Sequence, residues 1–177
     1  MTVAANRYAT ALIDVLDSTQ AEAGLQQLQN FAALLNEQPD SRRFLQNPAM
    51  SGERRARVLK EISAALSLDR RVGNFINILA NRNRLPILEE IIVEYQRLMD
   101  KRLGIVRARV TSAQPLDNAQ QQDLARKFQE ITGKQVRMEV ALDASLIGGV
   151  VAQVGSTIYD GSVLQQLQTF KNRLVGD

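Results

Sequence analysis

Cysteine and histidine are both absent from the 177-residue sequence. Without thiolate and imidazole groups, the chain cannot form a zinc finger, a catalytic triad that uses histidine, or a haem site ligated by either residue. No window approaches the roughly 18 unbroken apolar residues of a membrane-spanning helix. Because cysteine and histidine are absent, any enzymatic chemistry would depend on carboxylates, lysine, arginine and hydroxyl groups.

The residues that are present describe a folded, water-soluble chain. Hydrophobic residues make up 45% and charged residues 23% of the sequence, a balance that excludes a disordered or low-complexity protein. The length predicts one domain or two small ones. A formal net charge of +3 is too small to indicate nucleic-acid binding by itself. The first residues carry charges of both signs among spaced apolar residues, so we expect neither a signal peptide nor a transit peptide.

The first part of the chain has the spacing of apolar residues typical of helices, interrupted by proline, glycine and Asp-Ser signals. Asp69 is expected to cap one helix, Pro86 to open another and Gly104 to end the last. The capping signal at Ser51 is only partial, because Arg54 stands where a capping box has glutamate. The predicted helices cover residues 2–18, 21–37, 40–46, 51–66, 69–83 and 86–102.

After Gly104 the apolar period changes to two, which predicts strands at 106–110 and 136–142 with one solvated face. A helix is expected between them at 117–132, ended by Gly133. Residues 149–153 and 157–159 could form a hairpin, and a final helix should start at Ser162 with Val163, Leu167, Phe170 and Leu174 on one face. We therefore predict an α+β protein: a six-helix N-terminal bundle at 1–104 and a smaller mixed α/β domain at 105–177.

The first and fifth predicted helices have broader apolar arcs than one core contact needs. Both could simply be central helices of the bundle. Alternatively, each could contribute half of its arc to the core and half to a groove that receives an amphipathic helix from a partner. The sequence pattern leaves both interpretations open.

Most segments that resemble a nucleotide-binding or catalytic motif lack the residues or the spacing that the motif requires. The glycine-rich segment 148–155 has the wrong glycine spacing and lacks the lysine of a phosphate-binding loop. Glu90 and Glu94 fall opposite the apolar arc of their helix, which indicates a solvated face rather than an acid–base pair. A carboxylate-based enzyme is therefore the least favoured function.

Arginine-rich helix faces suggest a second function, an RNA-binding helical protein. The run Arg54, Arg55, Arg57 and Lys60 could contact phosphates, but no aromatic platform accompanies it. A solvated helix face is the default interpretation of this run. Phosphate binding would weaken steeply with salt, whereas groove binding would not, so the two functions can be separated by experiment.

Three segments resemble one known family. Residues 146–163, Leu-Ile-Gly-Gly-Val-Val-Ala-Gln-Val-Gly-Ser-Thr-Ile-Tyr-Asp-Gly-Ser-Val, are similar to the C-terminal signature of the delta subunits of bacterial F-type ATP synthases, the family of the oligomycin-sensitivity-conferring protein. Ala-Asn-Arg-Tyr-Ala-Thr-Ala-Leu at 5–12 and Asn-Phe-Ile-Asn-Ile-Leu-Ala-Asn-Arg-Asn-Arg-Leu at 74–85 resemble the same family. The resemblance extends over the whole chain.

This resemblance implies a non-catalytic stator subunit without cofactor or metal. In such proteins the N-terminal domain binds the N-terminal helix of an alpha subunit of the catalytic head, and the C-terminal domain binds the b subunits of the peripheral stalk. The subunit thereby resists rotation of the head during proton-driven ATP synthesis. The resemblance further implies a peripheral membrane protein on the cytoplasmic face of the bacterial inner membrane, with no direct membrane insertion and no nucleic-acid partner.

Transferred to this sequence, the resemblance predicts a partner groove between the first and fifth helices. Its expected lining is Tyr8, Leu12, Val15, Phe75, Ile78 and Leu79. Aromatic and aliphatic anchors in such a groove would give the slow release that a stator contact requires.

Overall fold

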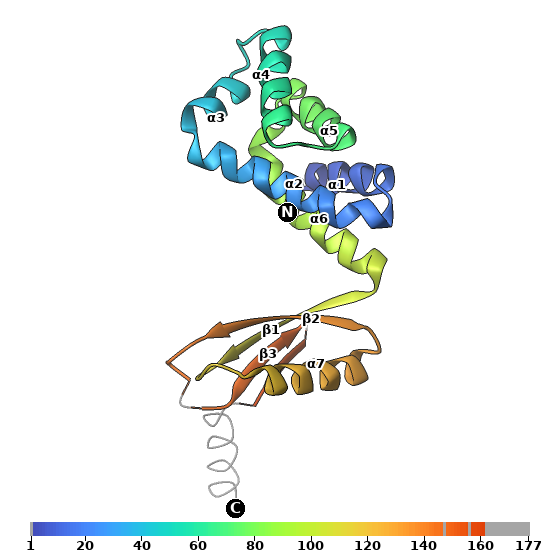
Figure 1. The fold of residues 1–177 in the computed structure, drawn as a ribbon, viewed down its shortest axis with the longest axis vertical. Coiled ribbons are helices and arrows are strands. Elements are labelled where there is room, and N and C mark those ends of the chain that lie inside the picture. Colours follow the sequence, from blue (N-terminus) through green and yellow to red (C-terminus); the bar gives the residue numbers. More distant parts are fainter. Residues whose placement is uncertain (1, 147, 156, 162–177) are drawn as a thin grey trace, which may run out of the picture. The chain divides into compact units, whose positions relative to one another are not determined.

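The computed structural model describes residues 2–146, 148–155 and 157–161. The chain divides into two compact units, Met1–Met99 and Asp100–Asp177, close to the predicted boundary at Gly104. The α+β class is confirmed, since the described residues form helices followed by a four-stranded mixed sheet (Figure 1).

The helices before the sheet lie within a few residues of their predicted positions. Asp69 caps its helix as expected, with its side chain accepting a hydrogen bond from the backbone N–H of Arg71 at 2.8 Å. Ser51 makes no such bond. Pro86 lies in a short 3-10 turn rather than in the first turn of the last helix. The elements are α1 (Val3–Val15), α2 (Ser18–Glu37), α3 (Pro39–Gln46), α4 (Gly52–Ala65), α5 (Arg70–Asn81), the 3-10 turn η1 (Leu85–Ile87) and α6 (Leu88–Leu103).

One apolar core connects these helices. Phe31 of α2 is 1% exposed and Tyr95 of α6 is fully buried. The Tyr95 hydroxyl donates to the carbonyl of Ala21 at 3.1 Å, so the largest buried aromatic side chain also satisfies its polar end. This bond fixes α6 against the first turn of α2.

The prediction of a solvated arginine face on α4 is wrong for Arg55. Its side chain is only 4% exposed. The guanidinium donates to the carbonyl of Ala80 at the end of α5, at 2.5 Å, and to the carbonyl of Asn47 in the preceding loop, at 2.9 Å. Arg55 therefore joins three segments of the helical unit, whereas Arg54 and Arg57 beside it are exposed.

The predicted solvated face of α6 is also wrong in part. Glu94 is 5% exposed and accepts a hydrogen bond from Arg97 at 2.8 Å. Glu90 accepts bonds from the backbone N–H and the hydroxyl of Thr2, at 2.9 and 3.0 Å. The periodicity of α6 could not reveal that the start of α1 lies against this side of the helix.

In the second unit, the described residues from the start of β1 onward form a sheet with the strand order β2-β1-β3-β4 and the helix α7. Its elements are β1 (Ile105–Ser112), α7 (Asn118–Thr132), β2 (Gln135–Leu142), β3 (Val150–Val154) and β4 (Thr157–Asp160). β1 and β2 are parallel and joined through α7, while β3 pairs antiparallel with both β1 and β4. The predicted hairpin of the last two strands is thus confirmed. The predicted final helix, with Val163, Leu167, Phe170 and Leu174, lies outside the described residues.

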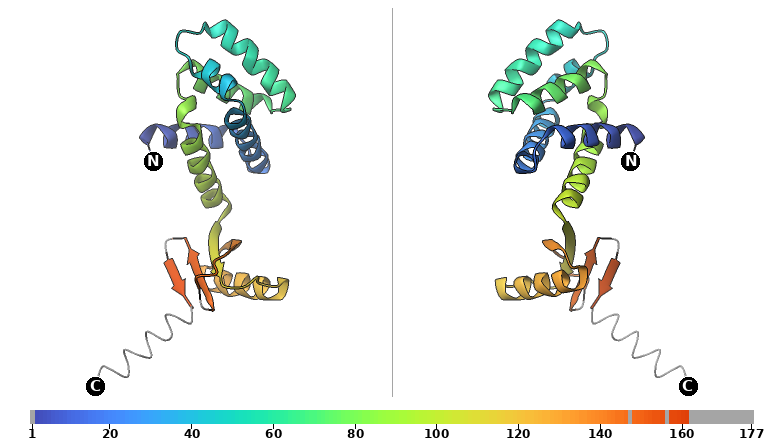
Figure 2. Two further views of the ribbon diagram at one scale, coloured as in Figure 1. Left: turned by 90° about the vertical axis from the view of Figure 1, so that its left-hand side faces the viewer. Right: turned by 90° about the vertical axis from the view of Figure 1, so that its right-hand side faces the viewer.

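The core of the second unit lies between α7 and one face of the sheet, as the two views of Figure 2 show. Alternate residues of the strands, including Ala108, Val110 and Ala152, point to this face and are buried. Phe128 is the largest side chain that α7 buries against them.

Gly133 ends α7 in the left-handed conformation, with a φ of +65°. A Cβ at this position would meet no atom within 4 Å, so only the backbone conformation disfavours a side chain. We expect Gly133→Ala to lower the free energy of unfolding by about 1 kcal/mol, measured by chemical denaturation. Gly52→Ala is the matched control, because its Cβ would also meet nothing and its φ is not positive. Equal effects of the two substitutions would contradict this account.

Candidate functional site

α1 and α5 lie side by side in the helical unit, as predicted for the two walls of a partner site. The rings of Tyr8 and Phe75 meet edge to face, with centroids 6.3 Å apart and planes at 72°. At the C-terminal end of α1, the Arg71 guanidinium donates to the carbonyl of Val15 at 3.2 Å and pairs with Asp17 at 3.7 Å. An aromatic contact and a polar contact therefore hold the two helices together.

The six predicted anchor residues divide into buried and accessible groups. Leu12 is 2% exposed, Leu79 is 0% exposed and Phe75 is 8% exposed, so these three belong to the core. Val15 and Ile78 are 55% and 48% exposed, and Tyr8 is half-buried. Most of each broad apolar arc thus faces the core, and we call the accessible remainder, Tyr8, Val15 and Ile78, the α1–α5 surface.

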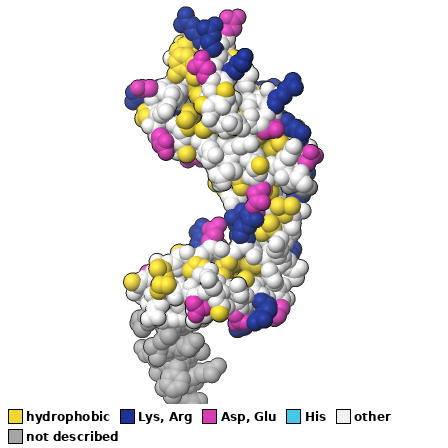
Figure 3. All heavy atoms as spheres, viewed as in Figure 1, with side chains coloured by type: hydrophobic (Ala, Val, Ile, Leu, Met, Phe, Trp, Pro, Cys, Tyr) yellow, Lys and Arg dark blue, Asp and Glu magenta, His cyan; other side chains and the backbone are white. Residues whose placement is uncertain are grey.

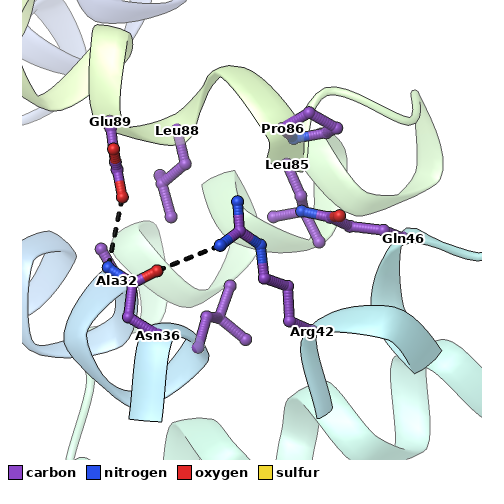
Figure 4. A pocket seen from close by; sticks show the side chains of 9 residues that line it. Ala32, Asn36, Arg42, Gln46, Leu85, Pro86, Leu88 and Glu89 are labelled. Carbon is purple, nitrogen blue, oxygen red and sulfur yellow. Dashed lines mark hydrogen bonds between the residues drawn. The ribbon is translucent and has the colours of Figure 1, made fainter. Parts of the chain in front are cut away.

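A small polar pocket lies where α2, α3 and α6 meet (Figure 4). Arg42 donates to the side-chain oxygen of Asn36 at 3.2 Å, and the Asn36 amide donates to Glu89 at 3.2 Å. The volume of about 20 Å³ has room for a water molecule but not for a substrate. This pocket connects three helices and offers no catalytic site.

Three of the charged groups with shifted pKa values, Arg107, Asp123 and Arg126, are partners in ion pairs, whereas hydrogen bonds from Ser145 lower the pKa of Asp143. The hydrogen bond from Arg107 to Asp100 raises the pKa of Arg107, with a further contribution from Glu139. Hydrogen bonds from Lys127 and Arg126 lower the pKa of Asp123. Both shifts favour the charged forms, which stabilises ion pairs and does not prepare a group for proton transfer. Among the described residues, no group of three or more carboxylates could hold a metal ion.

The sequence model of the ATP synthase delta (OSCP) subunit family matches residues 4–174. The chain belongs to this family. It is 39% identical over 171 residues to the ATP synthase subunit delta of Anaeromyxobacter dehalogenans (strain 2CP-1 / ATCC BAA-258), an alignment that covers 96% of each chain. It is 37% identical to the ATP synthase subunit delta of Geobacter metallireducens (strain ATCC 53774 / DSM 7210 / GS-15), covering 96% of this chain and 95% of that one.

A solved structure has the same fold. A chain in the cryo-EM structure of the Toxoplasma gondii mitochondrial ATP synthase hexamer matches with a TM-score of 0.65 and 23% identity, covering 99% of this chain and 98% of that chain. This similarity supports the arrangement of the elements described above.

Membership of the delta (OSCP) family confirms the stator function. The chain is a non-catalytic subunit of ATP synthase that links the F1 head to the peripheral stalk. The RNA-binding alternative has no support, and Arg55, one of the arginines of its proposed binding face, is buried. In the described part of the chain, no helix is both long enough and apolar enough to cross a membrane.

Proposed function

We propose that the helices α1–α6 act as one six-helix domain, residues 1–104, that binds the N-terminal helix of an alpha subunit at the α1–α5 surface. The observation that carries this proposal is the pair of exposed branched side chains, Val15 and Ile78, on two helices joined by the Tyr8–Phe75 contact. An amphipathic helix could lay its apolar face across them. Beneath this surface, the buried residues Leu12 and Leu79 hold the two helices in place.

The second domain, residues 105–177, binds the b subunits of the peripheral stalk in the same proposal. Each unit has its own apolar core, so two partners can be held by separately folded bodies. The subunit then lies on the cytoplasmic face of the membrane, attached through the ATP synthase complex. The family membership supports this assignment of the two partners.

Ile78→Asp tests the proposed alpha-binding surface. We expect it to weaken binding of a peptide with the sequence of the alpha N-terminal helix by at least about 2 kcal/mol, since a charge would replace an apolar anchor. Tyr8→Ala should have a similar effect. Titration calorimetry with the full chain measures the affinity, and circular dichroism checks that the helices remain.

The matched control is Val93→Asp. Val93 is 52% exposed on α6 of the same unit, close to the 48% of Ile78, but lies outside the α1–α5 surface. Its replacement should leave the affinity unchanged. Unaltered binding by Ile78→Asp, or equal loss in both variants, would remove the α1–α5 surface from the site.

A further inference from the structure

A second concave surface lies between α4 and α5. This α4–α5 groove has a volume of about 220 Å³. Its apolar part comes from Leu59, which is buried, and from Leu68, which is half-buried. The described residues that line it are Ala56, Leu59, Lys60, Ser63, Leu68, Asp69, Arg70, Gly73, Asn74 and Asn77.

Cations dominate the charge of this groove. Lys60 and Arg70 are both exposed, and neither forms an ion pair with a described residue. Among the described lining residues, Asp69 is the one carboxylate, and it accepts the backbone N–H of Arg71 at 2.8 Å. The groove lining therefore carries two cations and one carboxylate, and neither cation is paired with that carboxylate. In Figure 3, Lys and Arg side chains, with Asp or Glu side chains among them, lie at the end of the helical unit where α4 lies.

The α4–α5 groove is separate from the α1–α5 surface, although both use α5. Residues 70, 73, 74 and 77 line the groove, and their spacing places them along one side of the helix. Phe75 contacts Tyr8 on the side toward α1, and at about 100° per residue this direction lies well away from the groove. Ile78, the α5 member of the α1–α5 surface, lies about 90° around the helix from the middle of the groove lining. A helix bound over Tyr8, Val15 and Ile78 therefore leaves the groove open to another segment.

We propose that the α4–α5 groove binds a short acidic segment of the catalytic head, with its carboxylates at Lys60 and Arg70 and an apolar side chain against Leu59 and Leu68. Charge complementarity identifies the occupant as acidic. The head is its source because α5 also carries the α1–α5 surface, so this step rests on the proposed function. The apolar floor favours a peptide over a nucleic acid, which would contact the cations through phosphates alone.

Charge reversal of the two cations tests the proposal. In the full chain, Lys60→Glu combined with Arg70→Glu should weaken binding to purified catalytic head lacking this subunit by about tenfold at low salt, with the difference shrinking as salt is added. The control combines Arg43→Glu with Arg57→Glu, which changes the net charge equally at exposed positions outside the groove. An equal loss in both double variants, or no loss in the first, would overturn the proposal.

The absence of cysteine from the chain permits a direct identification of the occupant. Asn74 lies exposed in the groove wall, and Asn74→Cys can carry a photoactivated cross-linker in the reassembled complex. Mass spectrometry should locate the cross-link in an acidic segment of the head. A cross-link to a stalk subunit, to RNA or to a segment without carboxylates would overturn the proposal, as would the absence of any cross-linked product.

Titration with inorganic phosphate tests whether the groove is a peptide site or a site for small anions. Phosphate titrated into the isolated chain should cause no saturable shift of the backbone amide signals of residues 70–77 at millimolar concentration. Saturable shifts would show a small-anion site and contradict the acidic-segment proposal. Failure of the proposed function can be distinguished from failure of the groove proposal. If only the α1–α5 surface is wrong, Ile78→Asp leaves head binding intact, while Lys60→Glu combined with Arg70→Glu still weakens it.

Discussion

Arg55→Met is expected to lower the free energy of unfolding of the helical unit by about 3 kcal/mol, because it removes hydrogen bonds from a charged donor, one of them buried, that join α4 to α5 and to the preceding loop. The guanidinium donates to the carbonyls of Ala80 and Asn47 and, at 3.4 Å, to that of Met50. Methionine preserves most of the apolar stem of arginine, so the loss should come from the hydrogen bonds. Denaturant unfolding followed by circular dichroism measures it.

Two further variants separate this account from a general effect of removing arginine. Arg57→Met, at an exposed position of the same helix, should change the free energy of unfolding by less than about 0.5 kcal/mol. Arg55→Lys should not restore full stability, because one ammonium cannot reproduce the planar fork that reaches both α5 and the loop. Wild-type stability of Arg55→Met would show that the hydrogen bonds of Arg55 add no net stability.

The elements that could be predicted from the sequence are those determined by nearby residues. Asp69 caps α5 through the N–H two residues ahead, and Gly133 ends α7 because its own φ is positive. Asp117 forms the full capping box with Gln120 at the start of α7. Each interaction spans at most three residues, so residue type and spacing suffice to predict it.

Burial against distant segments could not be predicted in the same way. Arg55 and Arg57 have the same chemistry two positions apart, and only contact with Ala80, 25 residues later, buries the first. The apolar arcs of α1 and α5 were equally ambiguous. Periodicity gives the width of an apolar face, but the neighbouring helices decide that Leu12 is buried and that Val15 is exposed.

The α4–α5 groove had no periodic signal at all. Its lining mixes two leucines with small, amide and charged residues from α4, the following loop and α5. The small residues Ala56 and Gly73 on facing helices were the one sequence feature that could have indicated a groove, since small side chains leave space between packed helices. Such residues also occur within tightly packed helix pairs, so the hint becomes informative only with the groove geometry.

Phe128→Ala is expected to destabilise the second unit by about 3–4 kcal/mol, because it removes the largest side chain of a small core. The buried residues of this core in the described part of the chain are Ala108, Val110, Phe128, Val136, Ala152 and Val154. The Tyr159 ring, with its centroid 6.1 Å from that of Phe128, would also lose its contact. The other buried residues of this core in the described part of the chain are alanines and valines, which are too small to fill the cavity.

Ile131→Ala is the matched control for Phe128→Ala, because Ile131 is 59% exposed on the same helix and should contribute less than about 1 kcal/mol.

Since the two units have separate cores, we expect Phe128→Ala to unfold the sheet at lower denaturant while the helical unit keeps its transition. Hydrogen exchange measured by mass spectrometry, compared between peptides of the two units, can follow the two events. The variant should still bind the alpha peptide but lose the stalk, which would assign each partner to its domain. A single shared transition, with both partners lost together, would instead show that the two domains act as one cooperative body.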